Sequence, residues 1–301
     1  MGKIAFVFAG QGAQQVGMGR DLYETYPAAK AVMDLLPQQL RDVMFDGPAQ
    51  ELSKTVNTQP CLFAMDLACA KLLNENGVFA DAVAGFSLGE IPALAYSGVM
   101  TESDAFDFVC LRARAMQACG EKNKGAMFAV LRLPAGEVKA VCKSLQNAYP
   151  ANYNCPGQTV AACGEEVATA LVAAVAAAGG KAIPLAVSGA FHSPLMMQAG
   201  AEIEAYLAGK AFGQMRIPLY SNVTGELYES PKTLLTLQVT SPVLWQTTIE
   251  HMVADGVDTF IEVGPGKTLS GLIQKINGDV RTLNVCDLTS LQNTLTEVRN
   301  A

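Results

Sequence analysis

The chain has 301 residues, half of them hydrophobic and only 16% charged, a balance that predicts a globular protein with a substantial apolar core and excludes a disordered chain. Its net charge of −7 and its lack of basic runs argue against nucleic acid as a partner. No apolar run reaches the roughly 18 residues of a membrane-spanning helix, so we expect no membrane partner either.

The cysteines and the amino terminus both bear on location. Eight cysteines are scattered without a Cys-x-x-Cys pair, mostly in apolar surroundings, which predicts reduced and buried thiols. The amino-terminal residues combine one lysine with a short apolar run that passes into a Gly/Gln turn. This pattern favours a β-strand of the mature protein over a secretory signal. We therefore expect a cytoplasmic protein.

Short apolar runs and helical stretches alternate along much of the chain. The runs Lys3 to Ala9, Asp81 to Gly85 and Thr259 to Val263 predict β-strands. The main helical stretches are 60–74, 87–96, 102–118 and 247–255. Strands that alternate with helices favour an α/β fold with a mostly parallel sheet, covered by helices on both faces.

The stretch 125–187 has a different rhythm. Its predicted elements follow the order β-α-β-β-α-β, which is that of a ferredoxin-like unit. We therefore expect a small ferredoxin-like subdomain over 125–187, inserted into a large α/β domain formed by 1–124 and 188–301. A cleft between the two parts is the natural place for a substrate.

The segment Gly85-Phe86-Ser87-Leu88-Gly89 follows a predicted strand and precedes a predicted helix. A Gly-x-Ser-x-Gly sequence in that context is typical of a nucleophile elbow, where a sharp strand-to-helix turn exposes the serine hydroxyl. Free N–H groups at the start of the helix also point toward the reaction. We predict that Ser87 is the nucleophile of an acyl-transfer enzyme, and the simpler alternative is an ordinary glycine-rich turn.

A serine hydroxyl needs an adjacent base, usually histidine, and the sequence has only His192 and His251. His251 lies in a helical pattern, where a surface or half-buried histidine is the simpler interpretation. His192 follows the last strand of the predicted insert, which places it at the cleft. We predict His192 as the base, with a cap for the following helix as the alternative.

Two glycine-rich loops do not meet the requirements of nucleotide-binding motifs. After the first strand, Gln15 stands where a dinucleotide fingerprint needs its third glycine. Before Gly264-Pro265-Gly266-Lys267-Thr268, Ile261 occupies the place of the first glycine of a phosphate loop. We therefore interpret both as turns at the ends of strands.

A series of short segments, in order along the chain, carries a family resemblance. They are Gly10 to Gln14, Thr58 to Pro60, Gly85 to Glu90, Arg112, Asn154 to Gln158, Ala190 to Pro194, Ser221 to Gly225, Ser241 to Trp245 and Glu262 to Lys267. Together they resemble the malonyl-CoA:acyl carrier protein transacylase family and the related acyltransferase domains of fatty-acid and polyketide synthases. The resemblance implies an α/β-hydrolase-like large domain that carries a ferredoxin-like insert, as expected above.

The resemblance also implies a reaction. Members transfer a malonyl group from malonyl-CoA to the phosphopantetheine thiol of an acyl carrier protein, and here the intermediate would be malonyl-Ser87. The coenzyme A thioester enters as a substrate, with no bound cofactor and no metal. Fatty-acid synthesis is the expected pathway. The alternatives are a free-standing polyketide-synthase acyltransferase and a serine acyl-thioester hydrolase.

Several residue roles follow from the resemblance. His192 acts as the base for Ser87. The oxyanion is held by the backbone N–H groups of Gln11 and Leu88. The backbone carbonyl of Gln238 orients the histidine, so the resemblance implies a Ser-His dyad rather than a triad.

The resemblance further implies which residues contact the acyl group. Arg112 matches the arginine that pairs with the free carboxylate of malonate, a task that suits its planar fork. From the helical pattern alone, Arg112 is a solvated charge and Arg114 could serve equally. Phe191 resembles the phenylalanine of malonyl-selective members, whose ring leaves little room for an α-methyl branch. Asn154 and Phe86 are expected in the pocket, and Phe86 stands where many members have histidine.

Overall fold

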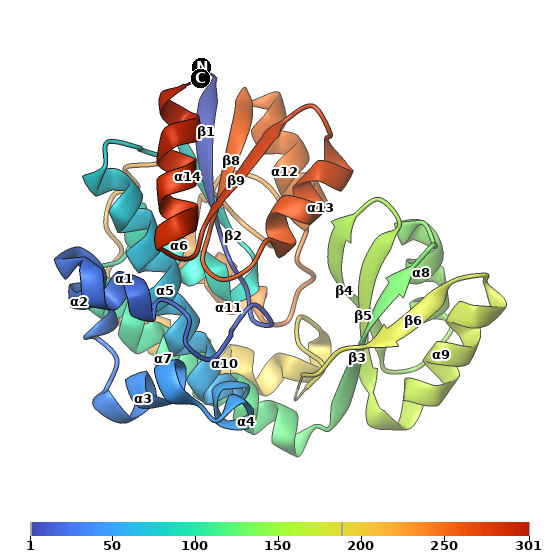
Figure 1. The fold of residues 1–301 in the computed structure, drawn as a ribbon. Coiled ribbons are helices and arrows are strands. Elements are labelled where there is room, and N and C mark those ends of the chain that lie inside the picture. The colour runs from blue at the N-terminus through green and yellow to red at the C-terminus, as the bar shows by residue number, and fades with distance from the viewer. Residues whose placement is uncertain (1, 188, 301) are drawn as a thin grey trace.

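Two separate β-sheets form the framework of the computed structural model, which describes residues 2–187 and 189–300 (Figure 1). The larger sheet has five strands in the order β7-β2-β1-β8-β9, and all of its pairings are parallel. These strands are β1 (Lys3–Phe8), β2 (Ala82–Gly85), β7 (Leu219–Tyr220), β8 (Val257–Val263) and β9 (Arg281–Val285). The mostly parallel sheet expected from the sequence is confirmed.

Helices cover both faces of the larger sheet, because both faces of its strands are apolar. Phe6 and Phe8 of β1 belong to one buried cluster, and the alternating Ala5 and Val7 belong to another. The first cluster is completed chiefly by α5 (Thr55–Glu75), α6 (Glu90–Tyr96), α7 (Glu102–Lys122), α10 (Met197–Leu207) and α14 (Leu288–Arg299). The second is completed by α12 (Trp245–Ala254) and α13 (Thr268–Ile276). The other helices around this sheet are α1 (Arg20–Thr25), α2 (Pro27–Met33), α3 (Gln38–Asp46), α4 (Ala49–Leu52) and α11 (Pro231–Gln238).

The smaller sheet is antiparallel, with four strands in the order β4-β5-β3-β6. Its elements are β3 (Gly125–Leu131), α8 (Ala135–Lys143), β4 (Ala148–Cys155), β5 (Gln158–Gly164), α9 (Ala168–Ala177) and β6 (Lys181–Pro184). Phe128 and Val130 of β3 pack with α8 and α9, whereas Met127 and Ala129 point to the other face. That second face is turned toward the larger sheet.

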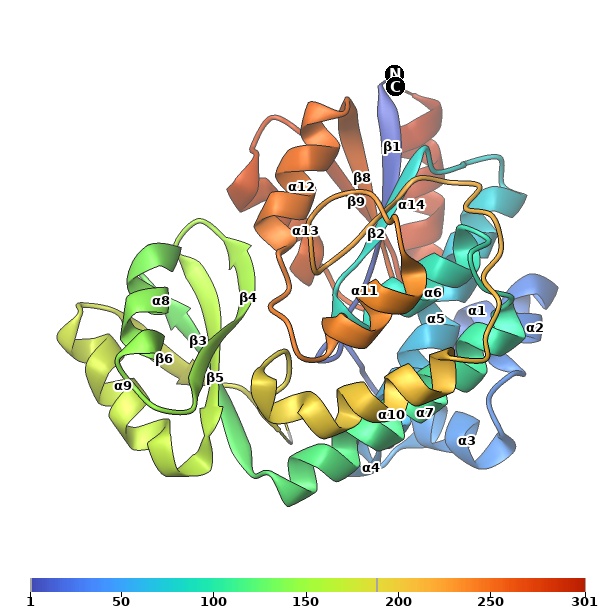
Figure 2. The ribbon, with the colours of Figure 1, turned by 180° about the vertical axis from the view of Figure 1, so that it is seen from behind.

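The two sheets are joined by backbone contacts as well as by the chain itself. In β4, the N–H of Tyr153 donates to the carbonyl of Val243 at 2.9 Å, and the N–H of Val243 donates to the carbonyl of Ala151 at 2.9 Å. The chain enters the small sheet from α7 and leaves it toward α10, and these two helices pack together (Figure 2). The predicted start of the second large-domain segment, residue 188, lies outside the described residues.

The helix α5 begins earlier than the sequence pattern indicates. Its first residue is Thr55, whereas the predicted helix started at Pro60. Pro60 instead lies inside the helix, where it cannot donate to a carbonyl one turn earlier. Both Pro60 and most of the rest of α5 are buried, so tertiary packing outweighs the local cost.

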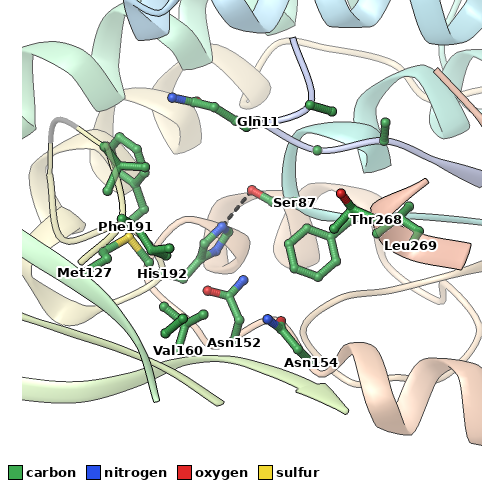
Figure 3. A pocket seen from close by; sticks show the side chains of 18 of the residues that line it. Gln11, Ser87, Met127, Asn152, Asn154, Val160, Phe191, His192, Thr268 and Leu269 are labelled. Carbon is green, nitrogen blue, oxygen red and sulfur yellow. Dashed lines mark hydrogen bonds between the residues drawn. The ribbon is translucent and has the colours of Figure 1, made fainter. Parts of the chain in front are cut away.

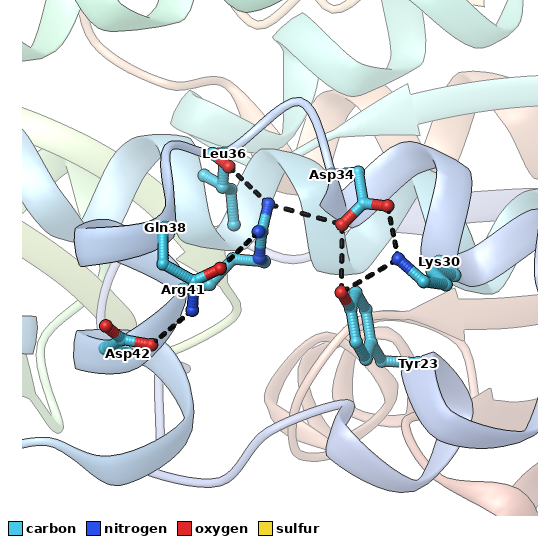
Figure 4. Close-up of polar contacts among 7 residues, drawn as sticks. All are labelled: Tyr23, Lys30, Asp34, Leu36, Gln38, Arg41 and Asp42. Carbon is cyan, nitrogen blue, oxygen red and sulfur yellow. Dashed lines mark hydrogen bonds and ion pairs between the residues drawn. The ribbon is translucent and has the colours of Figure 1, made fainter.

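A polar network ties together the short helices at the amino-terminal edge (Figure 4). Asp34, at the end of α2, accepts hydrogen bonds from Tyr23 at 2.9 Å and from Lys30 at 2.5 Å, and it pairs with Arg41 of α3 at 3.2 Å. Hydrogen bonding to Lys30 lowers the pKa of Asp34. Because these groups are largely exposed and screened by solvent, the network orients the helices more than it stabilises them.

The cysteines are free thiols at all eight positions, and six of them are buried. Burial raises the pKa of the Cys61 thiol to about 12, so this thiol stays protonated. Among the described residues, no helix combines the length and the apolar character needed to cross a lipid bilayer.

Asp66 is a buried carboxyl group whose effect on stability can be measured. It lies in α5 with no exposed surface, and neither carboxylate oxygen has a hydrogen-bond partner among the described residues. Burial, reinforced by the neighbouring Glu262, raises its pKa well above the ordinary value. The pKa of Asp66 is higher in the folded state than in the unfolded state. The free energy of unfolding is therefore at its full value below the unfolded-state pKa, where Asp66 is neutral in both states. It falls as the pH rises from there toward the folded-state pKa.

We expect Asp66→Asn to relieve this loss, because asparagine has the same shape and no charge at any pH. Relative to the wild type, its free energy of unfolding should increase between about pH 5 and about pH 8, by up to about 1.4 kcal/mol per pH unit. Urea unfolding at both pH values measures the difference. A difference between the two proteins that does not change with pH would show that Asp66 is not held neutral.

Candidate active site

The turn after β2 holds Ser87 in a conformation that few residues other than glycine adopt. Its φ is 55°, in the left-handed region. The flanking glycines are required by close packing, because a Cβ on Gly85 would lie 2.0 Å from the carbonyl carbon of Gly89. A Cβ on Gly89 would lie 2.2 Å from the carbonyl oxygen of Phe8 in β1. The turn therefore needs glycine at both positions.

The hydroxyl of Ser87 faces the ring of His192 (Figure 3). Ser87 Oγ lies 2.6 Å from His192 Nε2, although the two residues are 105 positions apart in the sequence. On the other side of the ring, His192 Nδ1 lies 2.8 Å from the backbone carbonyl oxygen of Gln238. Because a carbonyl oxygen only accepts, Nδ1 carries the proton and donates to it. The lone pair of Nε2 is then free to accept from the serine hydroxyl.

The surroundings of His192 favour its neutral form. The ring is buried, and burial, together with the nearby charge of Arg112, lowers its pKa to about 4. A histidine with this pKa is unprotonated at neutral pH. It can therefore take a proton from Ser87 without first losing one.

Arg112 is a buried cation beside the same hydroxyl. It lies in α7, and its Nη2 donates to Ser87 Oγ at 3.3 Å and to Gln238 Oε1 at 2.8 Å. Its Nη1 donates to Gln59 Oε1 at 2.8 Å. Burial lowers its pKa to about 10, so the group remains charged at neutral pH. Arg114, which the helical pattern could not separate from Arg112, is exposed.

Among the described residues, no carboxylate pairs directly with Arg112 within 4.0 Å. Arg112 Nε also has no hydrogen-bond partner among these described residues. A buried guanidinium that contacts only neutral groups retains capacity for an anion. This arrangement suits a substrate that brings its own carboxylate.

The hydroxyl opens into a cavity of about 270 Å³ between the two sheets (Figure 3). Six of the residues predicted for the site line it: Gln11, Phe86, Ser87, Asn154, Phe191 and His192. The small sheet contributes the opposite wall with Met127, Ala129 and Val160. Most of the lining is apolar, and its polar residues are Gln11, Ser87, Asn152, Asn154, Gln158, His192, Glu262 and Thr268.

Gln11 and Leu88 are the two residues whose backbone N–H groups are predicted to hold the oxyanion. Among the described residues, the N–H groups of Gln11 and Leu88 donate no hydrogen bond. Gln11 lies in the loop after β1, and Leu88 directly follows the serine. The side chain of Leu88 is fully buried in the hydrophobic core, which anchors the turn.

Phe86 forms an apolar wall beside the serine. Its ring meets the ring of Trp245 edge-on, with centroids 5.4 Å apart and an interplanar angle of 70°. Such a contact stabilises the pair beyond simple burial. The Phe86 side chain therefore offers no hydrogen bond to a bound group. It differs in this from the histidine that the sequence resemblance implies at this position in many family members.

The site also contains polar residues to which the sequence analysis assigned no role. Gln59 contacts Arg112, Asn222 accepts from the backbone N–H of Ser87 at 2.7 Å, and Glu90 contacts Asn222. All three lie in segments that carry the family resemblance, which was the available signal. Their function depends on contacts between distant segments, which a single sequence does not reveal.

His251 lies away from this group, as expected. It is half-buried in α12, and its Nδ1 lies 2.9 Å from the carbonyl oxygen of Gly225. For a metal site, the described residues offer no cluster of three or more His, Cys, Asp or Glu side chains.

The presence of only two histidines makes the protonation of His192 measurable by NMR. In protein labelled with ¹⁵N-histidine, we expect its ring to remain neutral at pH 6 and to protonate near pH 4. Arg112→Gln should raise this pKa, because it removes one of the two causes that lower it. The variant His251→Gln assigns the signals. Titration of His192 at its ordinary value of 6.5 in the wild type would contradict the burial argument.

Comparisons with known proteins identify the family of this chain. A sequence profile of the acyl transferase domain family matches residues 5–296. The chain is 39% identical over 306 residues to the malonyl CoA-acyl carrier protein transacylase of Bacillus subtilis strain 168, covering 97% of this chain and 96% of the relative. The malonyl CoA-acyl carrier protein transacylase of Clostridium perfringens has a TM-score of 0.95 at 37% identity, covering 99% of this chain and 98% of that chain.

A further solved structure contains a type II PKS acyl-carrier protein in complex with its malonyl-transacylase. The matching chain has a TM-score of 0.94 at 34% identity and covers 98% of this chain and 99% of its own length. The mixed α/β architecture is therefore shared over the whole chain. The protein belongs to the acyl transferase domain family.

Proposed function

We propose that this protein transfers a malonyl group from malonyl-CoA to the phosphopantetheine thiol of an acyl carrier protein, in fatty-acid synthesis. One observation carries the proposal: a base and a buried cation both contact the same hydroxyl, at 2.6 Å for His192 and 3.3 Å for Arg112. The base activates the hydroxyl, and the cation receives the carboxylate that distinguishes malonyl from simple acyl groups. The names of the relatives and the complex of one with a carrier protein support the same reaction.

In the first half of the reaction, Ser87 Oγ attacks the thioester carbonyl carbon while its proton passes to His192 Nε2. The carbonyl oxygen becomes an oxyanion, and the backbone N–H groups of Gln11 and Leu88 would receive it. Each such donor lowers the barrier by roughly 3 kcal/mol. The C–S bond then breaks, and His192 returns the proton to the departing thiolate of coenzyme A.

In the second half, the carrier-protein thiol attacks malonyl-Ser87 while His192 takes the thiol proton. Collapse of the second tetrahedral intermediate returns the proton to Ser87 Oγ and releases the malonyl carrier protein. The carbonyl of Gln238 stabilises the transient charge on the imidazole ring, because it accepts from Nδ1 in both halves. The proposed machinery is therefore a dyad oriented by a backbone carbonyl.

The acyl group is selected by charge and by shape. The malonyl carboxylate would pair with Arg112, whose planar fork offers donors that now contact the neutral amides of Gln59 and Gln238. Phe191 lines the cavity next to His192, where its ring would exclude an α-methyl branch. Asn154 lines the same cavity from β4, with an Oδ1 atom that has no partner among the described residues.

The proposal extends to the organisation of the chain. An α/β-hydrolase-like large domain, formed by 1–124 and 188–301, would carry the elbow, and a ferredoxin-like subdomain over 125–187 would cover the substrate. The parallel and antiparallel sheets support this division. The lack of disulfides among the eight cysteines supports a cytoplasmic location.

Incubation with malonyl-CoA alone should add one malonyl group to Ser87, because the acyl-enzyme forms before the carrier protein is needed. Intact mass and peptide mapping detect the adduct, which Ser87→Ala should lack. Carrier protein should then discharge it faster than water does. Rapid release of free malonate without carrier protein would instead identify a hydrolase, and absence of any adduct would contradict the proposed intermediate.

We expect Arg112→Ala to lower kcat/KM for malonyl transfer, because the buried carboxylate of the substrate loses its partner. The loss should correspond to roughly 2 to 5 kcal/mol of transition-state free energy. Transfer of acetyl, which has no carboxylate, should change far less. The exposed Arg114→Ala is the matched control and should behave as wild type. Equal losses for malonyl and acetyl would contradict the role of Arg112.

A further inference from the structure

Glu90 is a buried carboxylate behind the site that the reaction described above does not use. It is the first residue of α6 and has no exposed surface. One carboxylate oxygen accepts from the backbone N–H of Asn222 at 2.9 Å, and the other accepts from the side-chain amide of Gln238. Glu90 thus contacts two residues that in turn hold Ser87.

The contact with Asn222 leads to the backbone of the elbow. Asn222 Oδ1 accepts from the N–H of Ser87 at 2.7 Å, and Asn222 Nδ2 donates to the carbonyl of Gly85 at 2.6 Å. The side chain therefore spans the turn in which Ser87 has a positive φ. Such strained conformations persist where surrounding contacts hold them. By fixing the backbone of Asn222, Glu90 supports this span.

The contact with Gln238 leads to Arg112. A carboxylate accepts hydrogen bonds and cannot donate them, so the NH₂ end of the Gln238 amide must face Glu90. That end also donates to the carbonyl of Ser87 at 2.9 Å. The opposite end, Oε1, is then turned toward Arg112 Nη2 and accepts from it at 2.8 Å. Glu90 therefore determines which end of this amide the guanidinium meets.

In this arrangement the neutral amide of Gln238 lies between the carboxylate of Glu90 and the guanidinium of Arg112. Burial raises the pKa of Glu90 to about 7, while hydrogen bonds from Asn222 and Gln238 and the charge of Arg112 oppose that rise. Above pH 7 the carboxylate is ionised and compensates the charge of Arg112 without contacting it. A direct ion pair would occupy the guanidinium, whereas this indirect one leaves donors for a ligand.

We propose that Glu90 is a positioning residue for malonyl transfer. Its buried carboxylate orients the Gln238 amide, and that amide presents the guanidinium of Arg112 to the carboxylate of the substrate. The inference rests on the proposed function and deepens it, because it names a residue on which selectivity for malonyl depends although that residue does not line the cavity.

The variant Glu90→Gln tests the orientation with almost no change of shape. If the introduced amide keeps its oxygen toward the N–H of Asn222, its NH₂ group faces the NH₂ group of Gln238. The Gln238 amide must then turn over, which places donors against the donors of Arg112 and moves the guanidinium. Glu90→Asp, by contrast, keeps an acceptor-only carboxylate on a shorter chain and should restore part of the function.

The measurement is kcat/KM for malonyl-CoA and for acetyl-CoA at pH 8, with carrier protein in excess. We expect Glu90→Gln to lower the malonyl-to-acetyl ratio by roughly tenfold to hundredfold, as for loss of a hydrogen bond to a charged group. Glu90→Asp should lower it less. Asp66→Asn, which removes another fully buried carboxylate outside the site, is the matched control and should keep the ratio.

A wild-type ratio in Glu90→Gln, or equal losses for both substrates, would overturn the proposal, since a merely structural role would not distinguish them. If Glu90→Gln does not fold, Gln238→Met tests the same relay while it keeps the backbone carbonyl that contacts His192. That variant should also have a lower malonyl-to-acetyl ratio of kcat/KM, and an unchanged ratio would overturn the proposal. Failure of the wild type to transfer malonyl would instead count against the proposed function.

Discussion

The close packing of the start of α6 against the ends of β1 and β2 is the constraint on which the site depends. Glycines at 85 and 89 permit it, because a side chain at either position would overlap the neighbouring backbone. The resulting turn forces Ser87 into a positive φ and leaves the N–H of Leu88 without a partner among the described residues. The strain of the turn and the reactivity of the proposed nucleophile thus have one origin.

Burial shifts the pKa values of His192 and Arg112, but it leaves the two side chains in different charge states at neutral pH. It lowers the pKa of His192 to about 4, which keeps a proton acceptor available. It lowers the pKa of Arg112 only to about 10, which leaves a cation at neutral pH. Neutral amides from Gln59 and Gln238 contact this cation, and the proposed ligand carboxylate would pair with it. The same dry environment therefore supplies a neutral base and a positive charge that has no carboxylate partner among the described residues.

The second sheet supplies one wall of the cavity. Met127, Ala129 and Val160 form a wall opposite the elbow, and the backbone contacts of β4 with Val243 keep that wall in place. Phe86 and Phe191 close the cavity with apolar rings. A thioester would therefore leave water for a largely apolar chamber in which the polar groups at Ser87 act with little competition.

The parallel sheet, the elbow at Ser87 and the candidate base could be predicted from the sequence, because each is encoded by local patterns or by the scarcity of histidine. It also named Arg112 through resemblance, but the helical pattern could not separate it from Arg114, since both lie on one helix two residues apart. The burial of Arg112 beside Ser87 and the contacts of Glu90 with Gln238 and Asn222 became visible only in the folded chain. The contacts of Glu90 join segments more than 100 residues apart, and such distant pairings depend on packing rather than on local sequence.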